Sequence, residues 1–279
     1  MKRRTFTGIL AVAVFAAGLA ACSPSRAASV TERVEKTFTM QKGGSLSVSN
    51  VNGGITLKSW DKNEVQIVAI KRAKASSEDQ AKKVLSEIKL RFDASGNAVS
   101  VDTTLPKDSF FSFSWLTGGD SKSVTYTINA PSSIHVKLES VNGGIQVDSP
   151  GSEIQAETVN GKIGITRGGL LSATTVNGAI AFDVDNVRKV ETTNGSVHGT
   201  IRSLKPSRAS LETVNGSLRV AVNKSAAFHL DAENVNGSID CGFPSMSGSR
   251  HSLGGEVNGG GETLHMEAVN GSIAVHPAS

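Results

Sequence analysis

The dipeptide Asn-Gly recurs along this chain, and its spacing constrains the fold more than any other feature. From Asn142 onward, successive copies lie 18, 17, 17, 21, 21, 22 and 12 residues apart, and an earlier copy lies 90 residues upstream at Asn52. A repeat of about 20 residues is typical of solenoids, in which each repeat packs on its neighbours. The step of 12 predicts a short final turn. The predicted structural corners are Asn142, Asn160, Asn177, Asn194, Asn215, Asn236, Asn258 and Asn270.

Apolar residues flank each corner with the period of two expected of a strand that has one buried face. In most repeats they stand four residues before the asparagine and three and five residues after it. The glycine after each asparagine predicts a positive φ at the corner. The pattern predicts an all-β, single-stranded β-solenoid (β-helix-like) of about eight to ten coils, with stacked Asn-Gly corners whose side chains hydrogen-bond along the axis. An antiparallel hairpin at each Asn-Gly is the alternative.

Strict alternation has an unexpected consequence next to the corners. It places Thr158, Thr175, Thr192 and Thr213 inside and Val159, Val176 and Val214 outside. Two explanations remain open, a bulge at the corner or an exposed stripe of valines.

The region before the regular repeats contains a different pattern. Residues 76–87 predict one inserted helix, since Ser77 and Gln80 have capping-box spacing and an apolar stripe follows. Its expected role is to cover an exposed end of the β stack. The flanking segments 64–70, 89–92, 99–103 and 124–129 alternate as strands.

The N-terminus has the pattern of an export signal. A basic start and an uncharged run of 12 residues, Ile9–Ala20, precede Leu19-Ala20-Ala21-Cys22. The run is too short to span a bilayer as a helix, which needs about 20 residues. The motif resembles a bacterial lipobox, which implies acylation of Cys22, palmitate included, and a membrane anchor. By resemblance to the Gram-negative sorting rule, Ser23 indicates an outer-membrane lipoprotein of the cell envelope.

We therefore expect three parts. Residues 1–22 are a lipoprotein signal peptide with its lipobox, 23–29 a tether, and 30–279 one β-solenoid domain with an irregular part (30–135) and regular repeats (136–279).

A short aromatic segment stands out in a chain with few aromatic residues. It lies between Pro106 and Gly118-Gly119, so we expect a loop. The segment is a candidate for contact with a membrane or a partner, and the alternative is that it folds over the end of the core. The residues concerned are Phe110, Phe111, Phe113 and Trp115.

Two runs in the first half carry a family resemblance. Gly53-Gly54-Ile55-Thr56-Leu57-Lys58-Ser59-Trp60-Asp61 leads into a strand, and Tyr126-Thr127-Ile128-Asn129-Ala130-Pro131 leads into Val141-Asn142-Gly143. With the corners that follow, the chain resembles the bacterial putative adhesin domain family over nearly all of residues 30–279. The resemblance implies a β-solenoid lipoprotein, with adhesion as the suggested role and with no catalytic residues to transfer.

Motifs for catalysis, metal binding or nucleotide binding are absent from the sequence, so we expect no enzyme activity, no metal and no cofactor. Without residues 1–22 the chain has 26 basic against 25 acidic side chains, which gives no basic face for nucleic acid. Cys241 lies in an apolar column and is expected to be a buried thiol.

One column could carry chemistry. Three residues before each asparagine stand Glu139, Glu157, Thr174, Glu191, Glu212, Glu233, Gly255 and Glu267. A solvated face is the favoured interpretation, with Ca²⁺ binding or catalysis as alternatives. The sequence thus predicts a non-enzymatic, lipid-anchored envelope protein that binds an envelope protein or glycan or gives structural support. The alternative is a polysaccharide-active β-helix enzyme that uses the stacked Glu column.

Overall fold

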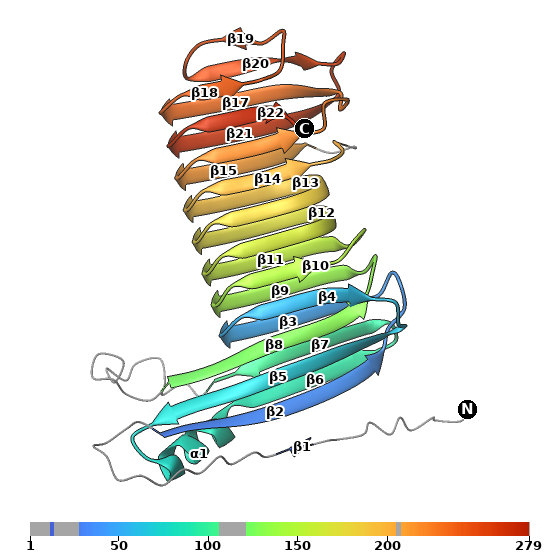
Figure 1. The fold of residues 1–279 in the computed structure, drawn as a ribbon, viewed down its shortest axis with the longest axis vertical. Coiled ribbons are helices and arrows are strands. Elements are labelled where there is room, and N and C mark those ends of the chain that lie inside the picture. Colours follow the sequence, from blue (N-terminus) through green and yellow to red (C-terminus); the bar gives the residue numbers. More distant parts are fainter. Residues whose placement is uncertain (1–11, 14–27, 106–120, 205–207, 279) are drawn as a thin grey trace.

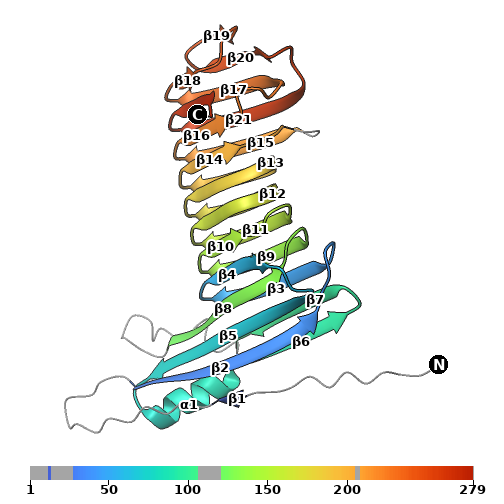
Figure 2. The ribbon, with the colours of Figure 1, turned by 45° about the vertical axis from the view of Figure 1, so that its right-hand side comes forward.

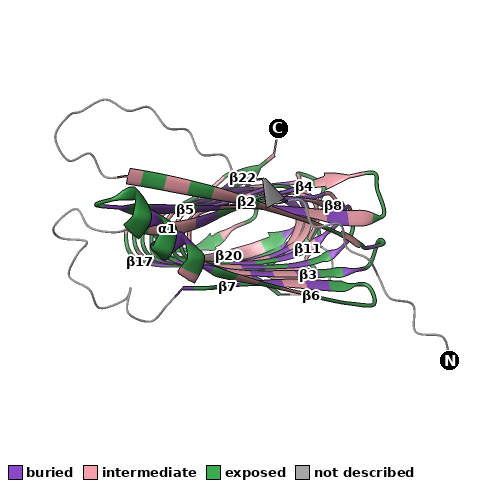
Figure 3. Ribbon diagram, turned by 90° about the horizontal axis from the view of Figure 1, so that it is seen from below, coloured by how far each residue is buried: buried purple, intermediate pink, exposed green. Residues whose placement is uncertain are grey.

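The structure is a computed structural model that describes residues 12–13, 28–105, 121–204 and 208–278. These residues form β-strands stacked into a tall column, with one helix at its lower end (Figures 1 and 2). Seen along the column, the strands form two facing layers with buried residues between them (Figure 3). The fold is therefore all-β, as the apolar periodicity predicts.

Each Asn-Gly unit contributes one strand to each layer. The strands that end at the corner asparagines form the leading layer, namely β3 (Ser45–Asn52), β9 (His135–Asn142), β11 (Glu153–Asn160), the later parts of β12 (Ile163–Asn177) and β13 (Ile180–Asn194), β15 (Ala209–Asn215), β21 (Glu262–Asn270) and β17 (Phe228–Asn236). The strands that follow the corners form the trailing layer, namely β4 (Ile55–Trp60), β10 (Ile145–Asp148), the first parts of β12 and β13, β14 (Val197–Ile201), β16 (Leu218–Val222), β22 (Ile273–Pro277) and β18 (Ile239–Cys241).

Strands of neighbouring units pair in parallel and in register. Ile145 of β10 lies opposite Ile163 of β12, and Ala156 of β11 lies opposite Ala173 of β12. The two strands that flank a corner lie in different layers and pair with the units above and below. The hairpin alternative is therefore wrong at these corners, because a hairpin would pair the flanking strands antiparallel with each other.

The core fills the space between the layers. Most predicted inward positions of the regular units are buried, and Leu138, Ile180 and Leu211 have no exposed surface. Side-chain sizes on neighbouring levels are complementary. Gly199 lies beside the ring of Phe182, and a Cβ on Gly199 would lie 2.2 Å from that ring. The narrow core therefore uses small and medium apolar side chains and few aromatic ones.

The lower end of the column is closed by antiparallel strands. β5 (Glu64–Ala75) pairs with β8 (Ser121–Pro131) and β2 (Ala28–Thr39) in one layer, and β6 (Lys89–Ser95) pairs with β7 (Ala98–Thr104) in the other. The two-residue strand β1 (Val12–Ala13) pairs antiparallel with β2. The four predicted strands of this region are confirmed, each longer than expected, because their antiparallel pairing extends beyond the alternating segments.

The inserted helix is also confirmed, as α1 (Glu78–Glu87). Ser77 is its N-cap and accepts a hydrogen bond from the Gln80 amide. Ala81, Val84 and Leu85 are buried, and the helix lies between the two layers at the lower end (Figure 3). It therefore covers the end of the core. Within the described ranges, no helix combines the length and the apolar character that a membrane crossing requires.

The upper end departs from the predicted order. β21 and β22, at the C-terminus, lie between β15–β16 and β17–β18, so the last unit in the sequence is the second-last level of the stack. The additional strand β20 (Ser252–Val257) pairs antiparallel with the outer edge of β17, and β19 (Ser247–Gly248) pairs with β20. Antiparallel strands therefore close the leading layer at its upper end, as they do at its lower end.

Asn258 is therefore not a stacked corner, and the predicted short final turn is wrong. Its φ of 52° places it in a tight turn before β21, where its side-chain amide donates to the carbonyls of Lys224 and Ala226. Gly255 likewise lies on β20, opposite Leu230. The sequence Val257-Asn258-Gly259 resembles a corner. The strand before it, β20, pairs antiparallel with β17, so this turn does not join two strands of the parallel stack.

Cys241 is only half-buried, which corrects the expected buried thiol. It belongs to β18, the last level of the trailing layer, so β22 covers it on one side only. Burial raises the pKa of its thiol.

We expect the Cys241 thiol to react more slowly with a maleimide at neutral pH in the native protein than in the urea-unfolded protein. A raised pKa lowers the thiolate fraction, which is the reactive form. The measurement uses a Cys22→Ser chain, so that one thiol remains. Equal rates in the two states would contradict this account of the level that contains β18.

Candidate functional site: the outer face of the leading layer

The corner asparagines form a continuous ladder along one edge of the column. Each Nδ2 donates to the Oδ1 of a neighbouring asparagine, in seven hydrogen bonds of 2.8–2.9 Å. This Asn ladder contains, in order, Asn52, Asn142, Asn160, Asn177, Asn194, Asn215, Asn270 and Asn236. The Asn ladder contains every predicted corner except Asn258.

The glycines after these asparagines are needed for a reason other than the predicted one. Among the described residues, five of the eight, Gly143, Gly161, Gly178, Gly195 and Gly216, have no positive φ. A Cβ on any of the five would instead lie 1.9–2.2 Å from a glycine carbonyl oxygen of the neighbouring level. Close approach of stacked backbones, rather than a left-handed turn, excludes side chains there.

The exposed valine stripe is real, and no bulge at the corner is required. Thr158, Thr175, Thr192 and Thr213 are at most 5% exposed. Each hydroxyl donates to a corner glycine carbonyl of the level below, at 3.0–3.2 Å. The residues that immediately precede the Asn ladder point outward, and five of them are 36–60% exposed. They are Val141, Val159, Val176, Val214 and Val235.

Thr175→Val should lower the free energy of unfolding by about 1–3 kcal/mol. The substitution keeps the shape of the side chain but removes the hydroxyl that donates to the Gly161 carbonyl. Thr193→Val is the matched control, because Thr193 is exposed and surface changes usually stay within about 0.5 kcal/mol. Chemical denaturation measures both variants, and equal losses would contradict a structural role for the buried hydroxyl.

The predicted Glu column lies on the same outer face. Parallel pairing sets Glu139, Glu157, Thr174, Glu191, Glu212, Glu267 and Glu233 opposite one another in successive strands. Adjacent members are separated by the strand spacing of about 4.8 Å. Gly255 is absent from the column for the reason given above. The acids form a row along the stack, interrupted at Thr174, and do not converge on one point.

Four of these acids bond to residues two positions away on their own strands. Lys137 and Lys189 form ion pairs of 2.7 and 2.5 Å with Glu139 and Glu191. Gln155 and Ser210 donate to Glu157 and Glu212. The lysine pKa values are raised by these glutamates. This polar column next to the Glu column consists of Ser47, Lys137, Gln155, Ser172, Lys189, Ser210, His265 and Asp231.

The Glu column has a gap at β12, where the short side chains Ser172 and Thr174 replace longer ones. A shallow hollow of about 510 Å³ lies over them, with Glu157, Glu191 and Glu212 among its lining residues. Beside it, Glu153 bonds Arg188 at 2.8 Å and His135 at 3.1 Å. The pKa of Glu153 is lowered, chiefly by Arg188, so this acid is ionised at neutral pH.

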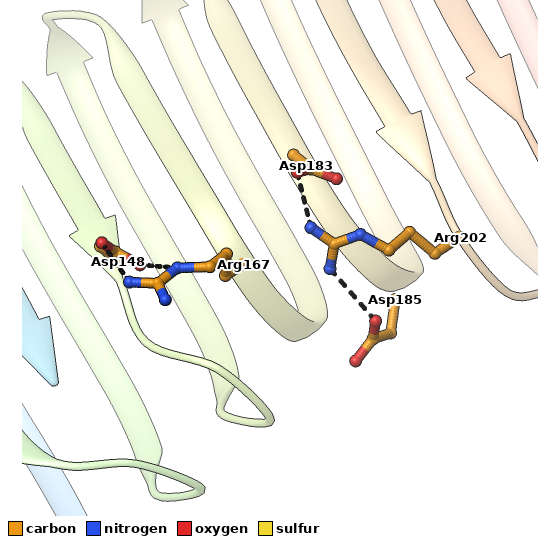
Figure 4. Close-up of polar contacts among 5 residues, drawn as sticks. All are labelled: Asp148, Arg167, Asp183, Asp185 and Arg202. Carbon is orange, nitrogen blue, oxygen red and sulfur yellow. Dashed lines mark hydrogen bonds and ion pairs between the residues drawn. The ribbon is translucent and has the colours of Figure 1, made fainter. Parts of the chain in front are cut away.

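On the trailing face, arginine and aspartate side chains form ion pairs with each other. Arg167 forms a two-bond pair with Asp148, at 2.8 and 2.7 Å, and Arg202 bridges Asp183 and Asp185 at 2.6 and 3.3 Å (Figure 4). Each arginine pairs with an acid on a neighbouring strand. These pairs tie adjacent levels together at the surface, where such contacts contribute little stability individually.

The remaining predicted site residues and the other groups that could carry chemistry fall in different places. Cys22 and the aromatic residues Phe110, Phe111, Phe113 and Trp115 lie outside the described residues. His265 and His276 bond Asp231 and Asp240 of the level above. Within the described ranges, no three His, Cys, Asp or Glu side chains are grouped as metal ligands.

The hollow and the contact between Glu153 and Arg188 were not predicted from the sequence. Arg188 reaches Glu153 across the intervening β12, which no local pattern indicates. The replacement of glutamate by Thr174 was visible in the aligned repeats and is the one signal of the hollow.

No family model and no curated protein sequence matches the chain. Among solved structures, a putative cell adhesion protein from Clostridium sporogenes is similar at 12% identity, with a TM-score of 0.38 over 88% of this chain and 100% of that one. A putative adhesin from Bacteroides fragilis is similar at 11% identity and TM-score 0.30, and a putative lipid binding protein from Parabacteroides distasonis at 11% and 0.32, each over 87% of this chain and 96% of the other. The adhesin descriptions are the same as that of the family the sequence resembles.

Proposed function

We propose that this protein is a non-enzymatic, lipid-anchored envelope protein in which a β-solenoid presents a flat face for binding or structural support. The observation that carries the proposal is the row of acids along the leading layer. Parallel pairing fixes neighbouring members of the Glu column one strand apart, and a long regular face of this kind is the surface through which solenoids contact partners.

The polysaccharide-active alternative requires a different geometry. A glycosidase of the usual kind needs two carboxyl groups that face each other across the scissile bond, one of them with a raised pKa. Here the Glu column projects side by side from one face, and the pKa of nearby Glu153 is lowered. This arrangement favours binding over hydrolysis.

The proposed anchor is the acylated Cys22. Several acyl chains hold a protein stably at a membrane, whereas one chain holds it only marginally. Replacing Cys22 with Ala and fractionating the cells tests the anchor. Membrane association and processing equal to those of the wild type would overturn it. Outer-membrane placement leaves two roles within the binding class, adhesion if the chain faces outward and contact with envelope components if it faces the periplasm.

The polypeptide that starts at Ser23 is the reagent for the binding function. We expect it to retain an envelope protein or glycan in a pull-down and to leave glycan substrates intact. Turnover of a glycan that is lost in Glu212→Gln or Glu233→Gln, with folding preserved, would overturn the non-enzymatic assignment.

A further inference from the structure

The two positions before the Asn ladder invert the usual arrangement of polar and apolar side chains. A threonine is buried and a valine is exposed, for example Thr175 at 1% and Val176 at 41%. The buried hydroxyl is explained by its bond to a glycine carbonyl of the next level. The exposed valine makes no comparable contribution to the fold.

The chain itself shows that the fold tolerates a polar residue at this exposed position. Thr193 occupies it in one level and is exposed like the valines. Threonine and valine are both β-branched and both favour strands. Strand propensity therefore does not account for valine in the other seven levels, which expose Val141, Val159, Val176, Val214 and Val235 and partly expose Val51 and Val269.

Two polar columns border this valine stripe. The Asn ladder lies on one side, and the Glu column lies two residues away on the other, about 7 Å along each strand. The Glu column and the polar column beside it together hold seven carboxylates against two lysines, a net charge of −5 with His265 neutral. Without residues 1–22 the chain has 26 basic against 25 acidic side chains, so this face is acidic on a nearly neutral protein.

We propose that the valine stripe and the Glu column form a docking band for a cationic, amphipathic polypeptide segment. Its apolar side chains would cover the valines, and its lysines or arginines would face the glutamates. This proposal rests on the proposed binding function and specifies the partner. Anionic lipid headgroups would be repelled by the acids, and an uncharged glycan would leave them without a counter-charge.

The dimensions of the band agree with a linear partner. Eight levels at about 4.8 Å give a stripe about 34 Å long. A helix of about 22 residues or a strand of about 10 spans this length. The two columns of the band are only about 7 Å apart. The area of the band is therefore smaller than the roughly 800 Å² that each partner buries in a standard protein interface. A segment that lies along the stack is therefore a better fit than a globular surface.

The test measures binding of defined probes to the polypeptide that starts at Ser23, without detergent and without the acyl anchor, by fluorescence anisotropy. The probes are a peptide of alternating lysine and valine, the same peptide with glutamate for lysine, and the same peptide with serine for valine. An uncharged cellulose-derived oligosaccharide and vesicles of phosphatidylcholine with phosphatidylglycerol represent the other occupants. We expect the lysine–valine peptide to bind most tightly, with an affinity that falls as salt rises.

Two triple variants separate the contributions of the band. Val159→Thr with Val176→Thr and Val214→Thr copies the side chain of Thr193, and Glu157→Gln with Glu191→Gln and Glu212→Gln keeps side-chain size. We expect each to weaken binding of the lysine–valine peptide at least about tenfold, with unchanged thermal unfolding. His198→Gln with Arg219→Gln, on the exposed trailing face, is the control and should bind as the wild type does.

Each outcome decides the proposal. Equal binding of the lysine–serine peptide, tighter binding of the glutamate peptide, or preference for vesicles or the oligosaccharide would overturn the docking band. Failure of all probes to bind would also overturn it. An envelope component captured equally by the wild type and both triple variants would overturn the band while leaving the proposed binding function in place.

Discussion

Gly178→Ala is expected to lower the free energy of unfolding by at least about 3 kcal/mol, the upper range for overpacking. An added Cβ would lie 1.9 Å from the Gly161 carbonyl oxygen and 2.6 Å from its carbon. Both atoms belong to backbone that is held by pairing on two sides, so the levels would have to separate. The hydrogen bond between Asn177 and Asn160 would be strained by the same separation.

Gly54→Ala is the matched control. It lies in the same kind of corner, but its Cβ would meet the nearest atom, the Gly144 carbonyl oxygen, at 3.4 Å, an ordinary contact. We expect a change below about 1 kcal/mol, in either direction, because alanine also reduces the entropy of the unfolded chain. Thermal denaturation should show a shift of roughly 2–4 °C for each kcal/mol lost in a domain of this size. Equal melting temperatures of the two variants would contradict the packing assigned to the glycines.

The second large effect concerns the inserted C-terminal level. Leu264 on β21 is fully buried and lies between Ala209 of β15 and Leu230 of β17. Leu264→Ala should therefore cost about 2–5 kcal/mol, the range for a core leucine. A leucine in the outermost level of a sequential stack would be covered on one side only and would cost less.

Leu253→Ala tests the same change on β20, where the side chain is only partly buried. We expect a smaller loss than for Leu264→Ala. Native-state hydrogen exchange should in addition show slower exchange for the amides of β21 than for those of β20. Faster exchange of β21, with a small effect of Leu264→Ala, would show that the C-terminal unit does not lie inside the stack.

The units of the stack could be predicted because their determinants are local. The buried columns, the corner asparagines and the helix that begins after Ser77 all follow from periodicity and capping within a few residues. Even the exposed valines followed from alternation. The sequence left two explanations for them, and the hydroxyl bonds of the buried threonines explain why alternation continues to the corner.

Other properties depend on which levels lie next to each other. Gly178 looks like a turn glycine in the sequence, and only the approach of Gly161 shows that its role is steric. Cys241 fits an apolar column as well as Val220 does, yet it is half-buried because its level is the last. Neighbouring levels, and not local residues, therefore set the burial and the backbone contacts of each position.

The sequence by itself determined the strand–corner–strand unit, the columns that face the core and the acids that share one face. It did not determine the order of the last two levels. The apolar columns and corner asparagines of β17–β18 and β21–β22 fit β15–β16 in the same register, so local pairing does not distinguish them. The tertiary structure decided the order, because β20 can pair antiparallel with β17 only if β17 has a free edge, which requires the C-terminal unit to lie below it.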